Sequence, residues 1–128
     1  MADYRDLVVW SKSYAFTLAV YRATKSFPRE EAFGITSQLR HAAVSIPANI
    51  AEGNSRNSRP DYVRFLTIAR GSTGELDTLL SLSKDLRYLD NDTAQGLKEQ
   101  LTEIRRMLTR LMQALRAPKK ADAGGAVG

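Results

Sequence analysis

The stretch FGITSQLRHAAVSIPANIAEGNSRN, residues 33–57, decides how this chain folds. Apolar and small residues recur in it at steps of three and four, which places them on one face of a helix. The residues of that face are Thr36, Leu39, Ala43, Ile46, Ile50 and Gly53. Pro47 has no N–H to donate to the carbonyl of Ala43, so we expect the helix to bend there. Small side chains around the bend allow a second helix to come close, which predicts the central helix of a bundle.

Two other stretches, one before and one after it, have the same periodicity. The first spans residues 4–26 and ends at Phe27-Pro28, because proline disfavours helical backbone in the residue before it. The second begins after Ser58, a good N-cap, and continues to about Leu89. The expected buried face of the first is Leu7, Trp10, Tyr14, Leu18 and Tyr21. The expected buried face of the second is Tyr62, Phe65, Ala69, Ser72, Leu76, Leu79, Ser83 and Leu86.

A fourth amphipathic stretch follows the turn Asp90-Asn91-Asp92 and stops before Pro118. Its apolar face is Leu97, Leu101, Ile104, Leu108, Leu111 and Leu115. Four such helices with short links predict an all-α fold, an antiparallel up-down-up-down four-helix bundle with a proline-kinked second helix. We expect the bundle to span residues 1–116. Residues 117–128 are mainly alanine, glycine and lysine and are expected to form a disordered C-terminal tail.

Composition narrows the class of protein. A chain of 128 residues fits one domain, and the absence of cysteine excludes disulfides and thiolate catalysis. No basic region followed by an apolar run begins the chain, and the run from His41 to Ala51 is too short for a membrane span of about 20 residues. We therefore expect a cytoplasmic protein with no membrane role. The net charge of +5 favours acidic partners, nucleic acid first.

Enzyme chemistry finds little support in the residues. His41 is the only histidine and Gln38 stands three residues before it, so the Glu-x-x-His pairs of di-iron bundles are missing. We expect His41 at a surface or interface, and no catalytic residue, metal or cofactor. Helix capping accounts for the acid pairs Glu30-Glu31 and Asp90/Asp92. Residues 71–74, GSTG, have the spacing of a KH-domain loop but fall inside a helix, where each glycine costs roughly 1 kcal/mol, so we expect close packing there.

Charge is uneven along the expected bundle. The end that gathers residues 1–19, 47–72 and 105–128 carries twelve cations against five anions, a net charge of +7, and the other end carries −2. A solvated basic surface is one interpretation and a phosphate-binding surface is the other. The candidate nucleic-acid-binding residues are Arg56, Arg59, Arg64, Arg70, Arg105, Arg106 and Arg110. Tyr62 and Phe65 lie among them and could stack on bases, although their helical spacing favours core packing.

A buried polar contact is expected between the second and third helices. Antiparallel packing around a turn near Arg56 brings Arg40 and Glu75 within roughly one helical turn, about 5.4 Å. Both flank the apolar face, where an unpaired charge is costly. We predict that they form a salt bridge, or share a polar network with Gln38 and Ser72.

Three segments resemble a known family. They are SQLRHAAVSIPANIAEG at 37–53, DLVVWSKSYAFTLAVYRATKSFPREEAFG at 6–34 and FLTIARGSTGELDTLL at 65–80. Together they are similar to the 23S rRNA-intervening-sequence proteins, which are four-helix bundle proteins. The resemblance implies a protomer that assembles into a homopentamer. It also implies kinship with the accessory variability determinant of diversity-generating retroelements, a basic pentamer that binds nucleic acid and a reverse transcriptase. It supplies no catalytic residues.

The leading hypothesis is a non-enzymatic oligomer that binds RNA or DNA backbone without reading sequence. A protein-interaction scaffold or adaptor with no nucleic-acid role is the alternative. Apolar residues outside one face of each helix favour an oligomer, since a lone bundle needs one apolar face per helix. Those residues include Val9, Phe16, Val20, Val44 and Ala48.

Overall fold

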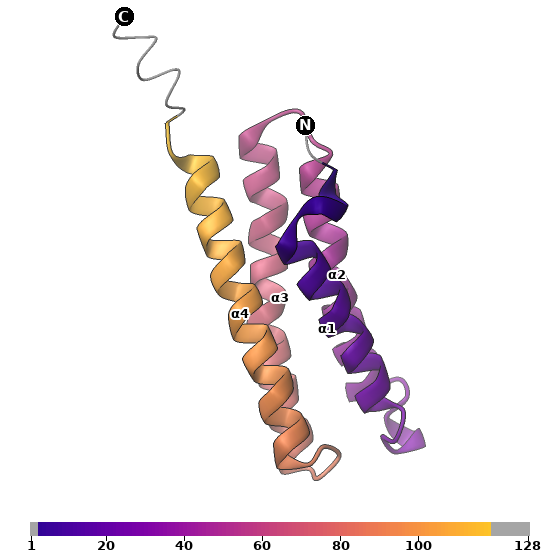
Figure 1. Ribbon diagram of the computed structural model, residues 1–128. Helices are drawn as coiled ribbons and strands as arrows, with labels where there is room; N and C mark the ends of the chain where they lie inside the picture. Colours follow the sequence, from indigo (N-terminus) through magenta and orange to yellow (C-terminus); the bar gives the residue numbers. More distant parts are fainter. Residues whose placement is uncertain (1–2, 119–128) are drawn as a thin grey trace, which may run out of the picture.

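The computed structural model describes residues 3–118 (Figure 1). Within that range the chain is all-α: it forms four α-helices and two short 3-10 helices, and no strand. The helices are α1 (Val8–Thr24), α2 (Ile35–Asn54), α3 (Arg59–Asp85) and α4 (Asn91–Arg116). The 3-10 helices are η1 (Tyr4–Asp6) and η2 (Arg29–Glu31). The expected tail from Ala117 on lies outside the described residues except for Ala117 and Pro118.

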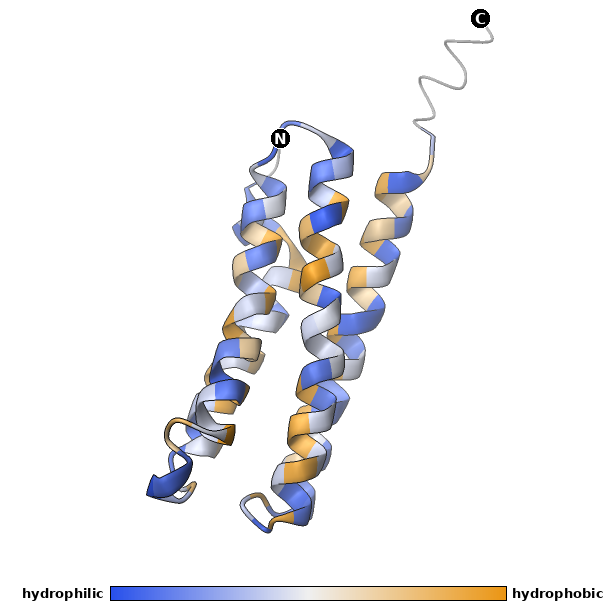
Figure 2. Cartoon of the chain, turned by 180° about the vertical axis from the view of Figure 1, so that it is seen from behind, coloured by the Kyte–Doolittle hydropathy of each residue, from blue (hydrophilic) through white to orange (hydrophobic). Residues whose placement is uncertain are grey.

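The helices pack in a closed square. α2 packs on both α1 and α3, and α4 packs on both α3 and α1, whereas the Cα atoms of the diagonal pairs stay more than 8 Å apart in the described part of the chain. Figure 1 shows the α2–α3 turn and the end of α4 at the end of the molecule where the N-terminus lies. The α1–α2 and α3–α4 connections lie at the other end. Figure 2 shows apolar and hydrophilic residues alternating along the helices, as amphipathic packing requires.

The apolar face of α2 forms the middle of the core. All six residues predicted for that face are buried, and Leu39, Ala43, Ile46 and Ile50 are fully so. Burying a leucine or isoleucine side chain contributes about 1.5–3 kcal/mol to folding. α2 continues as a helix through Pro47. The prediction that residues 33–57 contain the central packing helix is therefore confirmed.

The predicted buried face of the first helix is wrong for Tyr14, Leu18 and Tyr21, whereas Leu7 and Trp10 are partly buried against the core. α1 buries Val9, Ser13, Phe16, Val20 and Thr24, while Tyr14, Leu18 and Tyr21 are 50%, 41% and 39% exposed. Both faces of α1 carry apolar residues, so periodicity alone does not choose between them. The core takes the face without phenolic hydroxyls, since a buried hydroxyl needs a hydrogen-bond partner. Val9, Phe16 and Val20 are therefore core residues and give no support for an oligomer.

Local signals fix the helix ends. Ser58 accepts a hydrogen bond from the Asp61 N–H at 3.2 Å and begins α3, and Asp90 accepts one from the Thr93 N–H at 2.7 Å and begins α4. The hydrogen bonds from Thr93 hold the pKa of the Asp90 carboxyl below its ordinary value. α1 begins at Val8 rather than Tyr4, because Asp3 caps η1 first and Leu7 is extended.

The glycines do not behave as expected. A Cβ at Gly71 or Gly74 would meet no other atom within 4 Å, so close packing within the chain does not explain either residue. Close packing does occur at Gly53, where a Cβ would lie 2.9 Å from Cδ1 of Tyr62 and 3.0 Å from Cβ of Phe65. Gly53 therefore serves the approach of α2 to α3 and is not a left-handed helix cap.

Candidate nucleic-acid interface

The candidate arginines divide into two sets. The turn arginines, Arg56, Arg59 and Arg64, lie in or just after the α2–α3 turn. The α3/α4 arginines lie on the two facing helices and are Arg70, Arg105, Arg106 and Arg110. The two sets differ in what the protein already supplies as partners.

The turn arginines are engaged within the chain. Arg56 forms an ion pair with Glu52, and Arg64 forms one with Asp61 at 3.5 Å. Both guanidinium groups also lie over the ring of Phe65, at 4.8 and 4.5 Å from its centroid. Such cation–π contacts at exposed sites contribute about 0.5–1 kcal/mol each. Two guanidinium groups thus lie against the Phe65 ring that was considered for base stacking.

Arg59 and Tyr62 are also held by the protein. Arg59 donates to the carbonyl of Ala117 at 3.2 Å, which ties the start of α3 to the end of α4. Tyr62 is half-buried against Gly53, and its hydroxyl accepts a hydrogen bond from the side-chain amide of Asn54 at 3.2 Å. Burial raises the pKa of this tyrosine.

Among the described residues, the α3/α4 arginines have no carboxylate partner. Within residues 3–118 none of the four forms an ion pair. Two of the nearby acids are already used, since Glu103 pairs with Lys12 of α1 at 2.6 Å and Asp77 pairs with Lys98 at 3.5 Å, whereas Glu99 forms no ion pair within residues 3–118. Four like charges therefore lie on two facing helices with Glu99 as a nearby unpaired acid, an excess of positive charge that favours the binding of anions there.

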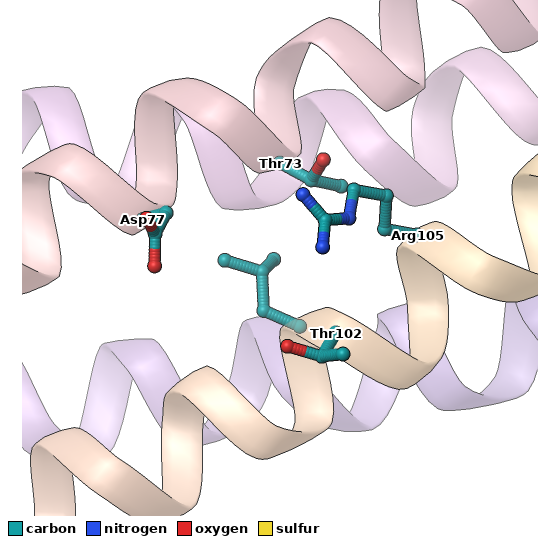
Figure 3. Close-up of a pocket in the computed structure, with 5 residues that line it drawn as sticks. Thr73, Asp77, Thr102 and Arg105 are labelled. Atoms are coloured by element: carbon teal, nitrogen blue, oxygen red, sulfur yellow. The ribbon is translucent and has the colours of Figure 1, made fainter.

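Two cavities open beside Arg105, and a third, of about 580 Å³, is lined by Arg106 and Arg110 together with Asp77, Glu99 and Glu103. The first has a volume of about 70 Å³ and is lined by Thr73, Asp77, Leu101, Thr102 and Arg105. In Figure 3, Arg105 extends from α4 across the gap toward Thr73 of α3. The second cavity, of about 300 Å³, is lined by Arg105, Arg106, Thr109 and Arg110. Charged and hydroxyl groups therefore line hollows in which a small anion can reach them.

The predicted Arg40–Glu75 salt bridge is wrong. Among the described residues Glu75 forms no ion pair and is exposed, and Arg40 turns toward α1 instead. Its Nε donates to the hydroxyl of Thr24 at 2.8 Å, its Nη2 donates to the carbonyl of Tyr21 at 3.3 Å, and its guanidinium lies 4.6 Å from the Tyr21 ring centroid.

Helix geometry explains this error. At about 100° per residue, Arg40 projects from the side of α2 that faces α1, whereas Ser45 projects toward α3. Ser72 accordingly donates to the hydroxyl of Ser45 at 3.0 Å, and no hydrogen bond joins it to Arg40 or Gln38 in the described chain.

The structure also shows where the other residues considered from the sequence lie. His41 is exposed, as expected. The described residues contain no group of three or more acidic or histidine side chains that could hold a metal ion.

Glu31 accepts a hydrogen bond from the hydroxyl of Tyr88 at 2.9 Å, which joins the two connections at one end of the bundle. This hydrogen bond raises the pKa of Tyr88. No helix within the described range is long and apolar enough to cross a bilayer.

Comparison with known proteins identifies the family of this chain. The family model for 23S rRNA-intervening sequence protein matches residues 5–110. The chain belongs to that family. A crystal structure of a protein of unknown function from the S23 ribosomal protein family of Bacteroides thetaiotaomicron is similar to it, with 26% identity and a TM-score of 0.74. The alignment covers 82% of this chain and 98% of the other. No functionally curated protein matches the chain.

This member of the 23S rRNA-intervening sequence protein family also exposes large apolar side chains on two faces. Tyr14, Leu18 and Tyr21 follow one side of α1, and Val44 of the adjacent α2 is 41% exposed. A separate set consists of Ile68 and Leu82 of α3 and Leu86 just after its end, whose spacing is close to whole helical turns. Sequence reasoning assigned Tyr14, Leu18 and Leu86 to the core, so it missed these faces.

Proposed function

We propose that this protein is a non-enzymatic homo-oligomer that binds the phosphate backbone of RNA or DNA through its α3/α4 arginines, without reading sequence. One observation carries the proposal: Arg70, Arg105, Arg106 and Arg110 form no ion pair in residues 3–118, while the nearby Asp77 and Glu103 pair with lysines. Guanidinium groups bind phosphate oxygens in a bidentate manner, which suits arginine to this role. No base-reading motif accompanies them.

Assembly is the second part of the proposal. The protomer we envisage is an antiparallel up-down-up-down bundle bent at Pro47. Two different apolar faces on one chain, on α1/α2 and on α3, support a contact in which one face of a copy meets the other face of the next. Such heterologous contacts generate rings when the rotation closes. The family resemblance implies a ring of five, which would repeat the arginine surface around it and strengthen its field.

Salt dependence tests the binding proposal. Affinity for mixed-sequence duplex DNA and for RNA should fall linearly on a log–log plot against salt, because phosphate contacts release counterions. Each arginine that contacts a phosphate of B-DNA should contribute about 0.9 to the slope. The variant Arg106→Gln/Arg110→Gln should therefore lower the slope by about 1.8. The control Arg56→Gln/Arg64→Gln removes the same charge from the ion-paired turn arginines and should change it less.

Two results would overturn this proposal. One is binding that does not depend on salt, or no binding at all. The other is an equal loss of slope in the control variant, which would show that net charge alone attracts the nucleic acid.

A protein-interaction scaffold is the second candidate, because the exposed apolar faces would also suit a partner protein. Light scattering separates the two at micromolar concentration. We expect a mass well above the 14.2 kDa of one chain, and a lower mass for Tyr14→Glu/Leu18→Glu. A wild-type mass of one chain would refute self-assembly and leave these faces to a different protein.

A further inference from the structure

Two arginines reach across the α3–α4 gap in opposite directions. Arg70 of α3 donates from Nη1 to the hydroxyl of Thr109 on α4 at 3.5 Å. Arg105 of α4 extends toward Thr73 of α3 and lines the cavity of about 70 Å³ (Figure 3). Arg105 and Thr109 are one helical turn apart, as are Arg70 and Thr73. Two positive charges and two hydroxyls therefore lie within one turn of each other on facing helices.

The hydrogen bonds within the chain leave several N–H and O–H donors of these side chains available to a ligand. A guanidinium has five N–H donors, and Arg70 uses one of them in a long bond to Thr109. Thr109 is an acceptor in that bond, and within the described chain its own O–H donates to nothing. Thr73 is different, because its O–H donates to the carbonyl of Arg70 at 2.6 Å. Arg105 makes no side-chain hydrogen bond or ion pair to residues 3–118.

We infer that Arg70, Arg105 and Thr109 form a discrete site for one phosphate group. Two guanidinium groups supply charge-assisted donors and the threonine supplies a neutral donor, and a tetrahedral phosphate has enough oxygens to accept from all three. The inference deepens the proposed function and rests on it in one respect, that the phosphate belongs to a nucleic acid. The phosphate chemistry itself is independent of that source.

The carboxylate of Asp77 limits how tightly this site can bind a phosphate. This carboxylate lines the same cavity as Arg105, but the ammonium group of Lys98 holds it at 3.5 Å. An incoming phosphate still meets repulsion from Asp77, screened by the exposed surroundings. Asp77→Asn removes that repulsion without changing the shape of the side chain, so it should tighten phosphate binding by about twofold.

The decisive variants alter one hydroxyl. Thr109→Val keeps the shape and charge of the site and removes the hydroxyl, which is both the donor to phosphate and the acceptor of the long Arg70 hydrogen bond, whereas Thr109→Ser retains it. With a mixed-sequence DNA duplex lacking terminal phosphates, Thr109→Val should weaken binding by about fivefold at every salt concentration. The salt slope should not change, because no charge is removed. Thr109→Ser should restore the affinity.

Arg70→Gln and Arg64→Gln form the matched pair for charge. Both remove one arginine from α3, and Arg64 is already paired with Asp61. Arg70→Gln should lower the salt slope by about 0.9, and Arg64→Gln should lower it less. A second duplex carrying 5′ phosphates distinguishes the sources of the ligand: a Thr109→Val defect confined to that duplex assigns the site to terminal phosphates rather than to the backbone.

Inorganic phosphate provides the measurement that does not need nucleic acid. Titration followed by NMR should shift the Thr109 amide and the Arg70 and Arg105 Nε–H signals of the wild type, and Thr109→Val should weaken that response. If the wild type binds phosphate in this way but no nucleic acid, the proposed function fails and the site stands. If the wild type binds the duplexes but Thr109→Val behaves as wild type in every assay, the site is overturned and the proposed function stands.

Discussion

The same substitution should have opposite effects at two glycines of this bundle. Gly53→Ala adds a Cβ 2.9 Å from Cδ1 of Tyr62, 3.0 Å from Cβ of Phe65 and 3.2 Å from the carbonyl oxygen of Tyr62. The last two atoms belong to the backbone or its first side-chain carbon and cannot rotate away, so α2 and α3 must separate. Gly71→Ala adds a Cβ with no atom within 4 Å.

Magnitudes follow from these surroundings. Alanine is favoured over glycine inside a helix by about 1 kcal/mol, which is the expected gain at Gly71. At Gly53 overpacking costs about 1–3 kcal/mol, so the net result after the helix gain is a loss of about 1 kcal/mol. For a domain of this size 1 kcal/mol moves the thermal midpoint by about 4 °C. The two variants should therefore melt about 8 °C apart, on either side of the wild type.

Denaturant titration and thermal melting measure both changes, with Gly96→Ala as the control. Gly96 lies in α4 and also has open space around its Cβ position, so that variant should gain about as much as Gly71→Ala. A smaller gain at Gly71 than at Gly96 would indicate that another copy packs on α3. Changes of the same sign at Gly53 and Gly96 would refute the reasoning from the added Cβ.

Three further predictions concern Pro47, Arg40 and Tyr88. If α2 is bent at Pro47 as proposed, Pro47→Ala should straighten it and change the mass in light scattering more than it changes the melting temperature; no change in either would contradict the proposed role of the bend. A double-mutant cycle on Arg40→Met and Thr24→Val should show coupling of about 1 kcal/mol, since their side chains bond directly, and Arg40→Met with Glu75→Gln should show none. Tyr88 has a raised pKa, so its stabilising contribution should be complete below about pH 10 and be lost as the pH rises through the folded-state pKa; Tyr88→Phe should abolish that part of the alkaline loss.

Sequence periodicity was sufficient where a helix has one apolar face. In α2 the choice was unambiguous, and every predicted residue is buried. In α4 Leu97, Leu101, Ile104 and Leu108 are buried as predicted. α1 has two apolar faces, and the choice between them depends on which hydroxyls can find partners: Thr24 bonds to the carbonyl of Val20, which no spacing rule reveals.

The sequence predicted which residues carry the positive charge of the candidate site, but not how those residues are arranged in space. The sequence identifies the basic residues and which end of the bundle they approach. The spacings of Glu52 with Arg56 and of Asp61 with Arg64 were available signals for the turn ion pairs. The sequence does not reveal which charges face one another between α3 and α4, because that depends on the rotation of each helix about its axis. Thr109 was not singled out; its position one turn after Arg105 was the available signal.

The only tryptophan of the chain, Trp10, lies in the first turn of α1, beside the exposed Tyr14. Trp10 is half-buried, with the ring of Tyr4 at 5.3 Å and that of Tyr14 at 5.1 Å between centroids. Its emission is therefore an intrinsic optical reporter of this face, with two tyrosine donors for energy transfer beside it. Dilution of an assembly that covers Tyr14 should shift the emission to longer wavelength, whereas phosphate that arrives at Arg70 on the α3/α4 side should leave it unchanged. One unlabelled sample can thus report assembly separately from anion binding.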